Sequence, residues 1–562
     1  MSIESPACLA VQRWEDAHSH LLSALTTYMD TCTSLKHSPL AGLATHTEDL
    51  IPRIERHITS LGSFVACQVS ETRSILSTTR NQLVSRIYAL PEEVLVEIFT
   101  RVIYLTDKSR QPMERALKTL YRHLHSLTEV CSSWRNIAIR RKDFWSIVPV
   151  IEKCECSGQL LEEVTERSLR RSSGAGLYVA IDSSHQLRTL LRPLISHGNH
   201  IKALNVRTKS RYTMKGALFT LPVFSLPGTL SELSIYLKPG AEYELPTDLD
   251  CEIIELPLQH QENFKRIFSS LRALRIRVAH IDLYDVSFAN LVELRLEDIR
   301  LGDQLIFKRL LGTISSALNL QYLHLAAVSS ITSHHHIISH DDDLPSISLP
   351  NLKQVYLSDM WFYDLKAIFE SFVPGHEKWM LSVPSYCIDA NLSGLFPEIT
   401  TQRLGLLLKG FNIDTLMLRG EGDENYLDGS KLSQLLRAVP TMTTLEMHGW
   451  YLDRLRLKAL THSLDFDGAE HTPFPCIHNL HIYHSRITDG FEEGIRAVVT
   501  SHKIQQLWLG GFSTSTSGDD SRKRTITDGD DIVGWLASNV LDFQLMGCYD
   551  TPESAIRKWC LW

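Results

Sequence analysis

The chain lacks the features that would assign it to a membrane or to the secretory route. In its 562 residues there is no run of about 18 apolar residues, so no membrane-spanning helix is predicted. Residues 1–6 show no basic segment that leads into an apolar stretch, so we expect no secretory signal. The 11 cysteines are scattered along the chain, as is typical of reduced thiols. These absences predict a cytoplasmic or nuclear protein.

An excess of positive charge is also missing. The formal net charge of −8 argues against nucleic acid or an anionic membrane as the main partner. Two short basic runs, residues 167–171 and 522–524, are predicted to be a solvated helix face and a loop. With 43% hydrophobic and 22% charged residues, the composition is that of an ordinary globular protein. The length exceeds one compact core, so several domains or a repeat array are expected.

Familiar catalytic motifs are absent as well. The chain contains no Gly-x-x-x-x-Gly-Lys-Ser/Thr loop, no Gly-x-Ser-x-Gly turn and no His-Glu-x-x-His pair. The densest group of metal-ligand side chains, residues 334–336 and 340–343, lies in a polar run and is predicted to be a solvated loop. Cys154 and Cys156 are too closely spaced for a zinc pair. We therefore expect no catalytic residue, no cofactor and no metal, and a hidden hydrolase or transferase is a distant alternative.

What the chain does have is an apolar helix that begins at Pro91. Proline suits the first helical position, and Glu92 and Glu93 follow where the helix dipole favours acids. Apolar residues then recur at helical spacing and predict one broad apolar face. They are Val94, Leu95, Ile98, Phe99 and Val102.

A second apolar face is predicted about thirty residues later. Its members are Leu127, Val130, Cys131, Trp134 and Ile137. Cys131 lies on this face, so we expect it to pack as a small hydrophobe and not to act as a nucleophile. Between the two faces, residues 106–112 form a polar, turn-forming stretch that predicts a surface loop. A helical pattern resumes at Ala116.

Together, the Leu90-Pro91 helix start, the apolar pairs and the Val-Cys-x-x-Trp-Arg ending at residues 130–135 resemble an F-box over residues 87–150. The stretch between Leu90 and Trp134 is longer than is usual in that family. The resemblance implies docking on the Skp1 adaptor of a cullin–RING ubiquitin ligase. The candidate residues for the docking face or its supporting core are Leu90, Pro91, Val94, Leu95, Ile98, Phe99, Val130, Cys131, Trp134 and Ile137.

From residue 177 onward the chain repeats a Leu-x-x-Leu-x-Leu strand phrase. After a strand at 177–182, the phrases occupy residues 201–206, 230–235, 271–276, 291–296, 320–325, 352–357, 413–418, 442–447, 477–482, 504–509 and 540–545. One wide gap predicts a weak phrase near residues 379–383. Helical stretches such as 305–311 and 432–436 lie between phrases. Each unit cannot bury its apolar strand alone, so stacked neighbours must share a continuous core.

This region resembles the irregular leucine-rich repeats of the large fungal (basidiomycete-type) F-box proteins. The regular Asn or Cys position of such repeats is missing, because Ala327, Asp359, Gly420 and Trp450 stand in comparable places. The predicted fold class is α/β: an amino-terminal helical segment and a helical F-box, followed by an irregular α/β leucine-rich-repeat solenoid with a parallel sheet. The residues expected to point inward along that sheet are Leu204, Ile235, Leu274, Leu294, Leu323, Leu416, Leu445, Leu480 and Leu507.

The first 86 residues form a separate helical pattern. One apolar face runs from Trp14 to Leu35, and after a break a second runs from Ile51 to Val69. Pro52 is tolerable only in a first helical turn. Thr72 and Thr79 interrupt the second seam, so a local helical hairpin is favoured over a self-associating coiled coil. The predicted domains are residues 1–86 as hairpin or short coiled coil, 87–150 as F-box and 151–562 as solenoid.

These patterns and resemblances predict a substrate-recognition adaptor of an SCF-type (Skp1–cullin–F-box) ubiquitin ligase and not an enzyme. Its partners would be Skp1, through it a cullin–RING ligase, and an unknown target protein. Exposed aromatic residues beside strands are the usual interface anchors, so Trp361, Trp450 and Trp508 are candidate target contacts; rings that fill an irregular core are the alternative. The alternative function is a repeat scaffold whose F-box-like helices only cap the solenoid.

Overall fold

A computed structural model describes residues 6–37, 47–84, 86–104, 111–151, 158–172, 174–183, 194–224, 228–238, 254, 261–284, 286–302, 304–330, 344–388, 400–420, 422–423, 426–461, 474–488, 490–514, 523–547, 550 and 559–561. The chain forms two compact units, Met1–Val94 and Leu95–Trp562.

The first unit is helical. It consists of α1 (Pro6–His37), α2 (Thr47–Ser60), a π-helical turn (Leu61–Val65), α3 (Ala66–Val84) and a short 3₁₀ turn (Arg86–Ala89). The helical prediction for this region is confirmed. The expected position of Pro52 is wrong, because α2 begins at Thr47 and Pro52 lies inside the helix, where it removes one backbone N–H donor.

Three helices follow. They are α4 (Glu92–Tyr104), α5 (Met113–Val130) and α6 (Ser132–Arg140), and a 3₁₀ turn (Lys142–Trp145) ends the segment. Helix α5 confirms the pattern that resumes at Ala116, and its apolar residues Leu117, Leu120 and Leu124 are buried. The predicted surface loop at residues 106–112 lies mostly outside the described residues.

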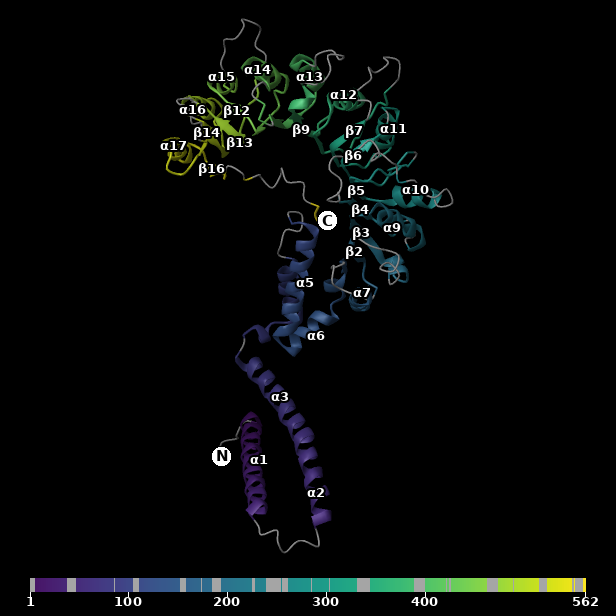
Figure 1. The fold of residues 1–562 in the computed structure, drawn as a ribbon, viewed down its shortest axis with the longest axis vertical. Coiled ribbons are helices and arrows are strands. Elements are labelled where there is room, and N and C mark those ends of the chain that lie inside the picture. Colours follow the sequence, from purple (N-terminus) through teal and green to yellow (C-terminus); the bar gives the residue numbers. More distant parts are fainter. Residues whose placement is uncertain are drawn as a thin grey trace. The chain divides into compact units, whose positions relative to one another are not determined.

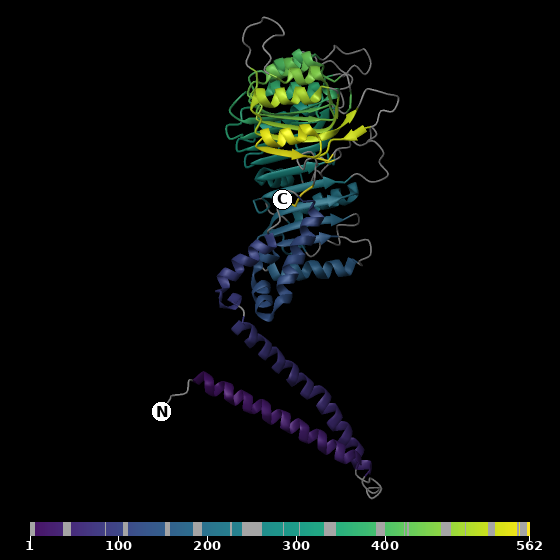
Figure 2. The same ribbon diagram turned by 90° about the vertical axis from the view of Figure 1, so that its left-hand side faces the viewer.

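The second unit is built on one 16-stranded sheet in which β1 to β11, β13 and β14 follow one another in chain order, while β12 pairs with β13 and both β15 and β16 pair with β14 (Figures 1 and 2). Its strands are β1 (Ile147–Ile151), β2 (Leu177–Ser183), β3 (Ile201–Thr208), β4 (Glu232–Leu237), β5 (Ala273–Arg277), β6 (Glu293–Leu301), β7 (Tyr322–Ser330), β8 (Gln354–Ser358), β9 (Lys378–Pro384), β10 (Ile413–Arg419), β11 (Thr444–His448), β12 (Tyr451–Leu452), β13 (Asn479–Ile487), β14 (Gln506–Thr514), β15 (Lys523–Thr525) and β16 (Asp542–Leu545). All described pairings are parallel except β14 with β15.

Helices between the strands cover the outer side of the curved sheet, and the strands line its inner side (Figure 1). The helices are α7 (Gly158–Ser172), α9 (Arg211–Phe224), α10 (Gln261–Ser270), α11 (Gln304–Ser315), α12 (Phe362–Ser371), α13 (Thr401–Leu408), α14 (Gly429–Ala438), α15 (Arg454–Ala459), α16 (Phe491–His502) and α17 (Asp531–Asn539). Aspartate side chains cap two of them, α14 and α15: Asp428 accepts the Lys431 N–H at 2.9 Å and Asp453 accepts the Arg456 N–H at 2.7 Å. Such caps fix where a helix begins.

The core lies between the sheet and these helices. All nine residues that were predicted to point inward are buried. They do not all share one register, because Leu204 pairs with Leu233, whereas Ile235 pairs with Val206, two residues further along the strand. The α/β class with a parallel sheet is therefore confirmed, with a small shift in the second phrase.

Two strands, β9 and β1, lie outside the clear strand phrases. The weak phrase in the wide gap is confirmed, because β9 pairs with β8 and β10. The strand β1 was not predicted. It lies inside the segment that was assigned to residues 87–150, and it pairs with β2 as the first strand of the sheet. Residues from Leu95 onward form one compact unit, and the predicted division after residue 150 stays a prediction.

The described end of the chain, Trp559–Leu561, lies against β3. The Asn205 amide donates to the Cys560 and Leu561 carbonyls at 3.1 and 2.6 Å, and its oxygen accepts the Trp559 indole N–H at 2.7 Å. The Trp559 carbonyl accepts the backbone N–H of Met113 at 2.9 Å. Met113 begins α5, and an N–H there has no partner within its own helix. These three residues therefore link the start of α5 to the sheet.

Candidate functional site

Helix α4 carries two apolar rows with opposite environments. Leu95, Phe99 and Ile103 are buried. One residue before each of them stand Val94, Ile98 and Val102; Val94 is 42% exposed, Val102 is 37% exposed and Ile98 is partly exposed. Residues four apart lie on one helical face. The predicted broad apolar face therefore splits into a buried row and an outer row of three aliphatic side chains, which we call the α4 stripe (Val94, Ile98, Val102).

The residues at the start of α4 are also open to solvent. Leu90 and Pro91 are exposed. The backbone N–H of Leu90 donates to the Ile87 carbonyl at 3.3 Å, and the N–H of Val94 donates to the Pro91 carbonyl at 3.1 Å. These bonds fix the turn into the helix without using either side chain. Both side chains thus remain available for contact with another molecule.

The face predicted between Leu127 and Ile137 is not one helical face. Cys131 adopts an extended conformation that ends α5 and begins α6, and its sulfur accepts the Trp134 backbone N–H at 3.4 Å. The expectation that Cys131 packs in an apolar face is wrong, because this half-buried thiol caps α6. The break separates Val130, which is 59% exposed, from Ile137, which is buried.

Trp134 supports the buried row of α4. Its ring lies 4.7 Å from the Phe99 ring, a distance typical of favourable aromatic pairs. Trp134 is half-buried, whereas Leu95, Phe99 and Ile137 are buried. The structure therefore separates roles that the sequence leaves together: these four residues hold the helices, and the α4 stripe, Leu90, Pro91 and Val130 are outside.

The three tryptophans proposed as target contacts have different environments. Trp450 is buried and its indole N–H donates to the Leu418 carbonyl at 2.9 Å. Its assignment as an exposed contact is wrong, because the ring fills the core beside Tyr426 at 5.2 Å. Trp361 is partly exposed and lies 4.7 Å from Tyr386.

Trp508 is partly exposed on the inner side of the sheet. It alternates along β14 with buried Leu507 and Leu509, so it faces away from the core. Its ring stacks on His481 of the neighbouring strand at 4.3 Å. The predicted strand-side position of Trp508 is confirmed, while its role in binding is untested.

The inner side of the earlier strands is polar and internally paired. Arg275 bridges Glu293 and Glu232, on the strands to either side of it. Arg277 pairs with Asp298 at 2.9 Å. Burial by itself would raise the pKa of Glu297, but a hydrogen bond with His324 and the charges of Arg295 and Arg277 lower it to about 2. The charges on these strands therefore largely neutralise one another.

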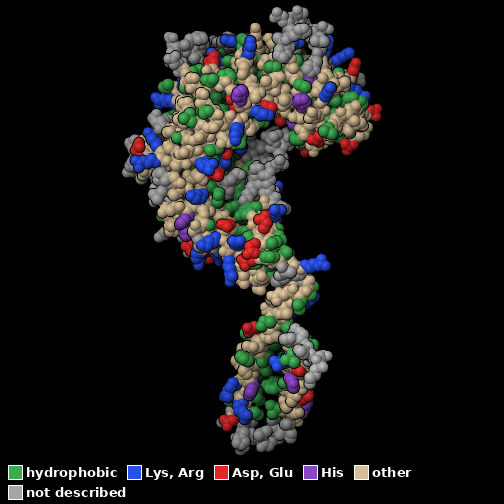
Figure 3. Space-filling view, turned by 180° about the vertical axis from the view of Figure 1, so that it is seen from behind, with side chains coloured by type: hydrophobic (Ala, Val, Ile, Leu, Met, Phe, Trp, Pro, Cys, Tyr) green, Lys and Arg blue, Asp and Glu red, His purple; other side chains and the backbone are tan. Residues whose placement is uncertain are grey.

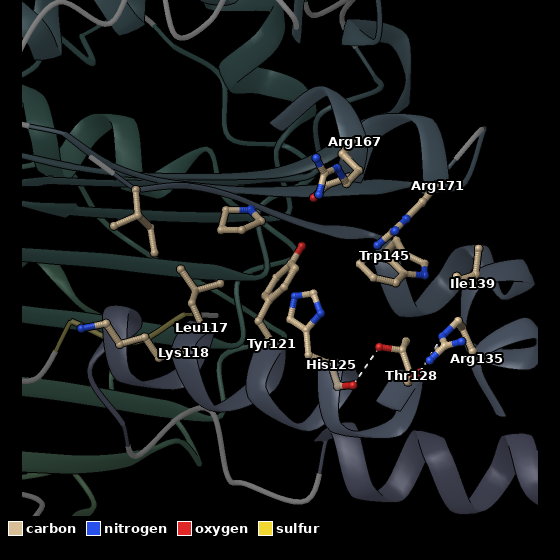
Figure 4. A pocket seen from close by; sticks show the side chains of 13 residues that line it. Leu117, Lys118, Tyr121, His125, Thr128, Arg135, Ile139, Trp145, Arg167 and Arg171 are labelled. Carbon is tan, nitrogen blue, oxygen red and sulfur yellow. Dashed lines mark hydrogen bonds between the residues drawn. The ribbon is translucent and has the colours of Figure 1, made fainter. Parts of the chain in front are cut away.

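A cleft of about 450 Å³ opens between α5, α6, β1 and α7. Figure 4 shows Arg167 and Arg171 of α7 on one side of the space and Tyr121 and His125 of α5 on the other. None of its lining residues is an acid, whereas Lys118, Arg135, Arg167 and Arg171 are cations. Lys118 is already paired with Glu114 at 2.6 Å. We call it the basic cleft, defined by these three arginines and the Trp145 ring. The predicted solvated helix face at residues 167–171 is thus only partly right, because Arg171 is half-buried.

Most donors around the basic cleft are satisfied within the protein. The Trp145 indole N–H donates to the Ala138 carbonyl at 2.9 Å and the Tyr121 hydroxyl donates to the Ile147 carbonyl at 2.7 Å. The Arg171 guanidinium lies 4.2 Å over the Trp145 ring. Burial, and then the neighbouring charge of Arg167, lower the pKa of Arg171. Within the described part of the chain, neither Arg167 nor Arg171 makes an ion pair.

The described residues include neither a candidate metal site nor a helix that could span a membrane. No cluster of His, Cys, Asp and Glu among them could hold a metal ion. The polar run at residues 334–336 and 340–343, and the cysteines 154 and 156, lie outside the described residues. In the described ranges, every helix is too short or too polar to cross a membrane.

In comparisons with known proteins, no protein-family model and no curated protein matches the chain.

Proposed function

We propose that this protein is the substrate-recognition adaptor of an SCF-type ubiquitin ligase. In this proposal residues 87–150 are an F-box that docks on Skp1, and the repeats that follow hold a target protein. The observation that carries it is the α4 stripe, which lies within the segment that resembles an F-box. The proposal includes no catalytic residue, cofactor or metal.

Single exposed apolar residues are common, but a continuous row is not. The α4 stripe places three aliphatic side chains over about two helical turns, directly beside a fully buried row. Exposed apolar groups arranged along a helix mark faces that pack against a partner. Leu90 and Pro91 are exposed just before this helix. We assign these five residues to Skp1 contact, with Val130 as a further candidate.

The remaining candidates receive supporting roles. Leu95, Phe99 and Ile137 are buried, so a partner cannot touch them in the folded chain. Trp134 packs on Phe99, and Cys131 caps α6. Their substitution should lower stability first and partner binding only as a consequence.

Function then follows from proximity. An adaptor that holds a target and a ligase together raises the effective concentration of target lysines near the activated ubiquitin. The curved sheet offers its inner side for the target, as in other solenoids. Trp508 and Trp361 remain candidate contacts because both are partly exposed. Trp450 is no longer a candidate because it is buried.

The test is co-purification of the full chain with Skp1. Leu90→Ala with Pro91→Ala, and separately Ile98→Asp, should reduce affinity on the order of a hundredfold, because central apolar anchors contribute several kcal/mol. Glu93→Ala is the matched control, since it changes an exposed residue of α4 that lies outside the stripe. Thermal unfolding should be unchanged in all three. Full Skp1 affinity in the folded stripe variants would refute the assignment.

The alternative is a scaffold in which these helices only cap the sheet. It is favoured by β1, which joins the F-box-like segment to the sheet, and by the bond from Met113 to the Trp559 carbonyl. The scaffold predicts no binding of Skp1 by the wild-type chain at all. Because of the same links the isolated segment 87–150 would lose native contacts, so the experiment requires the full chain.

A further inference from the structure

The helices of the first unit have no core of their own. No described residue of α1, α2, the π turn or α3 is buried. Nineteen large apolar side chains between Leu9 and Val84 are exposed. Long helices without tertiary packing are marginal in water. The unit has two helical arms, α1 and the continuous segment from α2 to α3. In Figure 3 hydrophobic side chains gather between these two arms. Its apolar faces therefore lack a partner.

The apolar residues of α1 follow a regular heptad spacing. The steps alternate between three and four residues, which places every member on one seam. The members are Val11, Trp14, His18, Leu21, Leu25, Tyr28, Cys32 and Leu35. Leu22 and Met29 stand beside the seam and are also exposed. A face wider than a strict two-position seam is typical of a helix in a bundle with more than one neighbour.

The second arm carries a matching seam that the π turn brings into phase. A π turn holds one residue more than a regular turn, so the apolar positions after Leu61 shift by one. With that shift the seam is Ile51, Ile54, Ile58, Leu61, Val65, Val69, Thr72, Leu76, Thr79 and Leu83. The two threonines, which interrupt the pattern, occupy equivalent positions. Their hydroxyls donate to the Gln68 and Ile75 carbonyls at 2.8 and 3.0 Å, so they can be buried with their donors satisfied.

We propose that a second copy of this chain covers these faces, and that two first units form a four-helix bundle. At roughly 50–80 Å² each, the nineteen side chains offer on the order of 1,000 Å² per copy, more than the ~800 Å² per partner of a standard stable interface. Two seams in each copy supply the four faces that a bundle needs. The described charges of the arms are mixed in sign, so two copies do not repel each other.

Light scattering on the full chain after size exclusion tests this proposal. Wild type should have twice the chain mass of 63.9 kDa. Leu21→Glu with Leu25→Glu places two charges on the seam and should give the single-chain mass. Ser23→Glu with Thr27→Glu adds the same charge to the opposite face and should leave the dimer intact.

Two results would overturn the dimer. One is a monomeric wild type at tens of micromolar, which would mean that the arms close on each other or remain open. The other is an assembly whose mass is the same in the seam variant. Binding of Skp1 is a separate readout, because the seam variant leaves the α4 stripe unchanged. Loss of the dimer with retained Skp1 binding, or the reverse, therefore distinguishes this inference from the proposed function.

The basic cleft carries a second, independent inference. Three arginines line a cleft that no acid lines, and burial together with the neighbouring charge of Arg167 lowers the pKa of the half-buried Arg171. Like charges gathered around a concave, largely apolar space are stabilised when an anion enters it. The Trp145 ring holds the Arg171 guanidinium from one side. We infer that the basic cleft binds an organic oxyanion whose apolar part contacts Ile139, which lines the cleft and is exposed.

Phenyl phosphate is the probe, with inorganic phosphate and phenol as its two halves. Calorimetry on the full chain should show saturable binding of phenyl phosphate that exceeds binding of either half. Arg167→Gln should weaken it at least tenfold, and Arg170→Gln, an exposed neighbour that does not line the cleft, should not. A phosphotyrosine nonapeptide distinguishes a protein-borne group from a free molecule. No saturable binding of either probe, or equal affinities in both variants, would rule out the site.

Discussion

Removing the Trp559 side chain should release the carboxyl-terminal segment from the sheet. Trp559 is 7% exposed, and its ring lies 5.2 Å from the Tyr236 ring. Truncating a buried Trp to Ala costs ~3–5 kcal/mol. The Asn205 oxygen would also lose the indole donor, a further cost of ~1 kcal/mol. The segment Trp559–Leu561 can detach while the sheet stays folded, so the loss is limited to its docking free energy and we expect about 3 kcal/mol.

That loss is local, so hydrogen exchange is the assay. The Met113 N–H donates to the Trp559 carbonyl, and about 3 kcal/mol corresponds to exchange roughly a hundredfold faster. Peptides that cover residues 111–118 and 201–208 should lose protection in Trp559→Ala. Trp559→Phe keeps a ring beside Tyr236 but not the indole N–H, and should lose protection about tenfold.

The control is Leu541→Ala, which removes a side chain that is 92% exposed. It should leave exchange in both peptides unchanged. Equal protection of Met113 in wild type and Trp559→Ala would refute the reasoning, because it would mean that the carboxyl-terminal contacts do not hold the start of α5.

Four further outcomes are expected. Trp450→Ala should destabilise the second unit by ~3–5 kcal/mol and Trp508→Ala by much less, because only Trp450 is buried; thermal melts of both variants check this. Gly494→Ala should destabilise, since a Cβ there would lie 2.7 Å from the Leu457 side chain, while Gly534→Ala, with no atom within 4 Å, should be neutral or stabilising by up to ~1 kcal/mol. Burial and then His484 and Arg419 lower the pKa of His448 to about 4 from 6.5. Between these pH values the unfolded chain binds a proton at His448 that the folded chain does not, so the free energy of unfolding should fall by about 1–2 kcal/mol after solvent screening as the pH drops from 6.5 to 4. Thermal melts at several pH values check this, and the loss should be smaller in His448→Gln. Val278→Gly should change the melting temperature little, because relief of the strain of a β-branched residue at φ 62° is offset by the loss of a side chain that packs against the core.

The strand phrases were predictable because two physical rules agree on them. Alternation places Leu294 and Leu296 on the core side of β6, and repetition of the same pattern requires stacked parallel strands. The wide gap could be filled from Trp379 and Leu381 alone. The strand β1 was missed because Pro149 argues against a strand. As the first strand of the sheet, β1 pairs only with β2, and an edge tolerates a residue without an N–H.

The candidate site was only partly predictable. Helical spacing identifies Val94, Leu95, Ile98 and Phe99 as apolar, but not which row is covered, because that depends on where α5 and α6 lie. Trp450 follows one phrase and Trp508 lies inside another, and the first ring turns into the core while the second lies on the inner side of the sheet. The Asn205 contacts join residues more than 350 positions apart, and no local pattern predicts such a pair.

A recurrent structural feature lies on each side of several strand phrases. Before the phrase, Asn290, Asn319 and Asn351 each donate to a carbonyl of the preceding connection, at 3.0, 2.7 and 3.0 Å. Two residues after it, the backbone turns left-handed, as at Ala327 (φ 50°) and Asp359 (φ 53°). These two places were noted from the sequence only as departures from a regular pattern.

The left-handed turn explains why residue identity varies at that place. The turn is set by backbone conformation, so Val278, Asp298 and His484 adopt it as Ala327 does, each at a cost of ~1–2 kcal/mol relative to glycine. Gly449 occupies the equivalent place with φ 68° and without that cost. The packing of the stacked Leu residues holds the turn in its left-handed conformation and compensates for the strain. A stacked parallel sheet therefore requires a recurring backbone turn at this place, and not a recurring side chain.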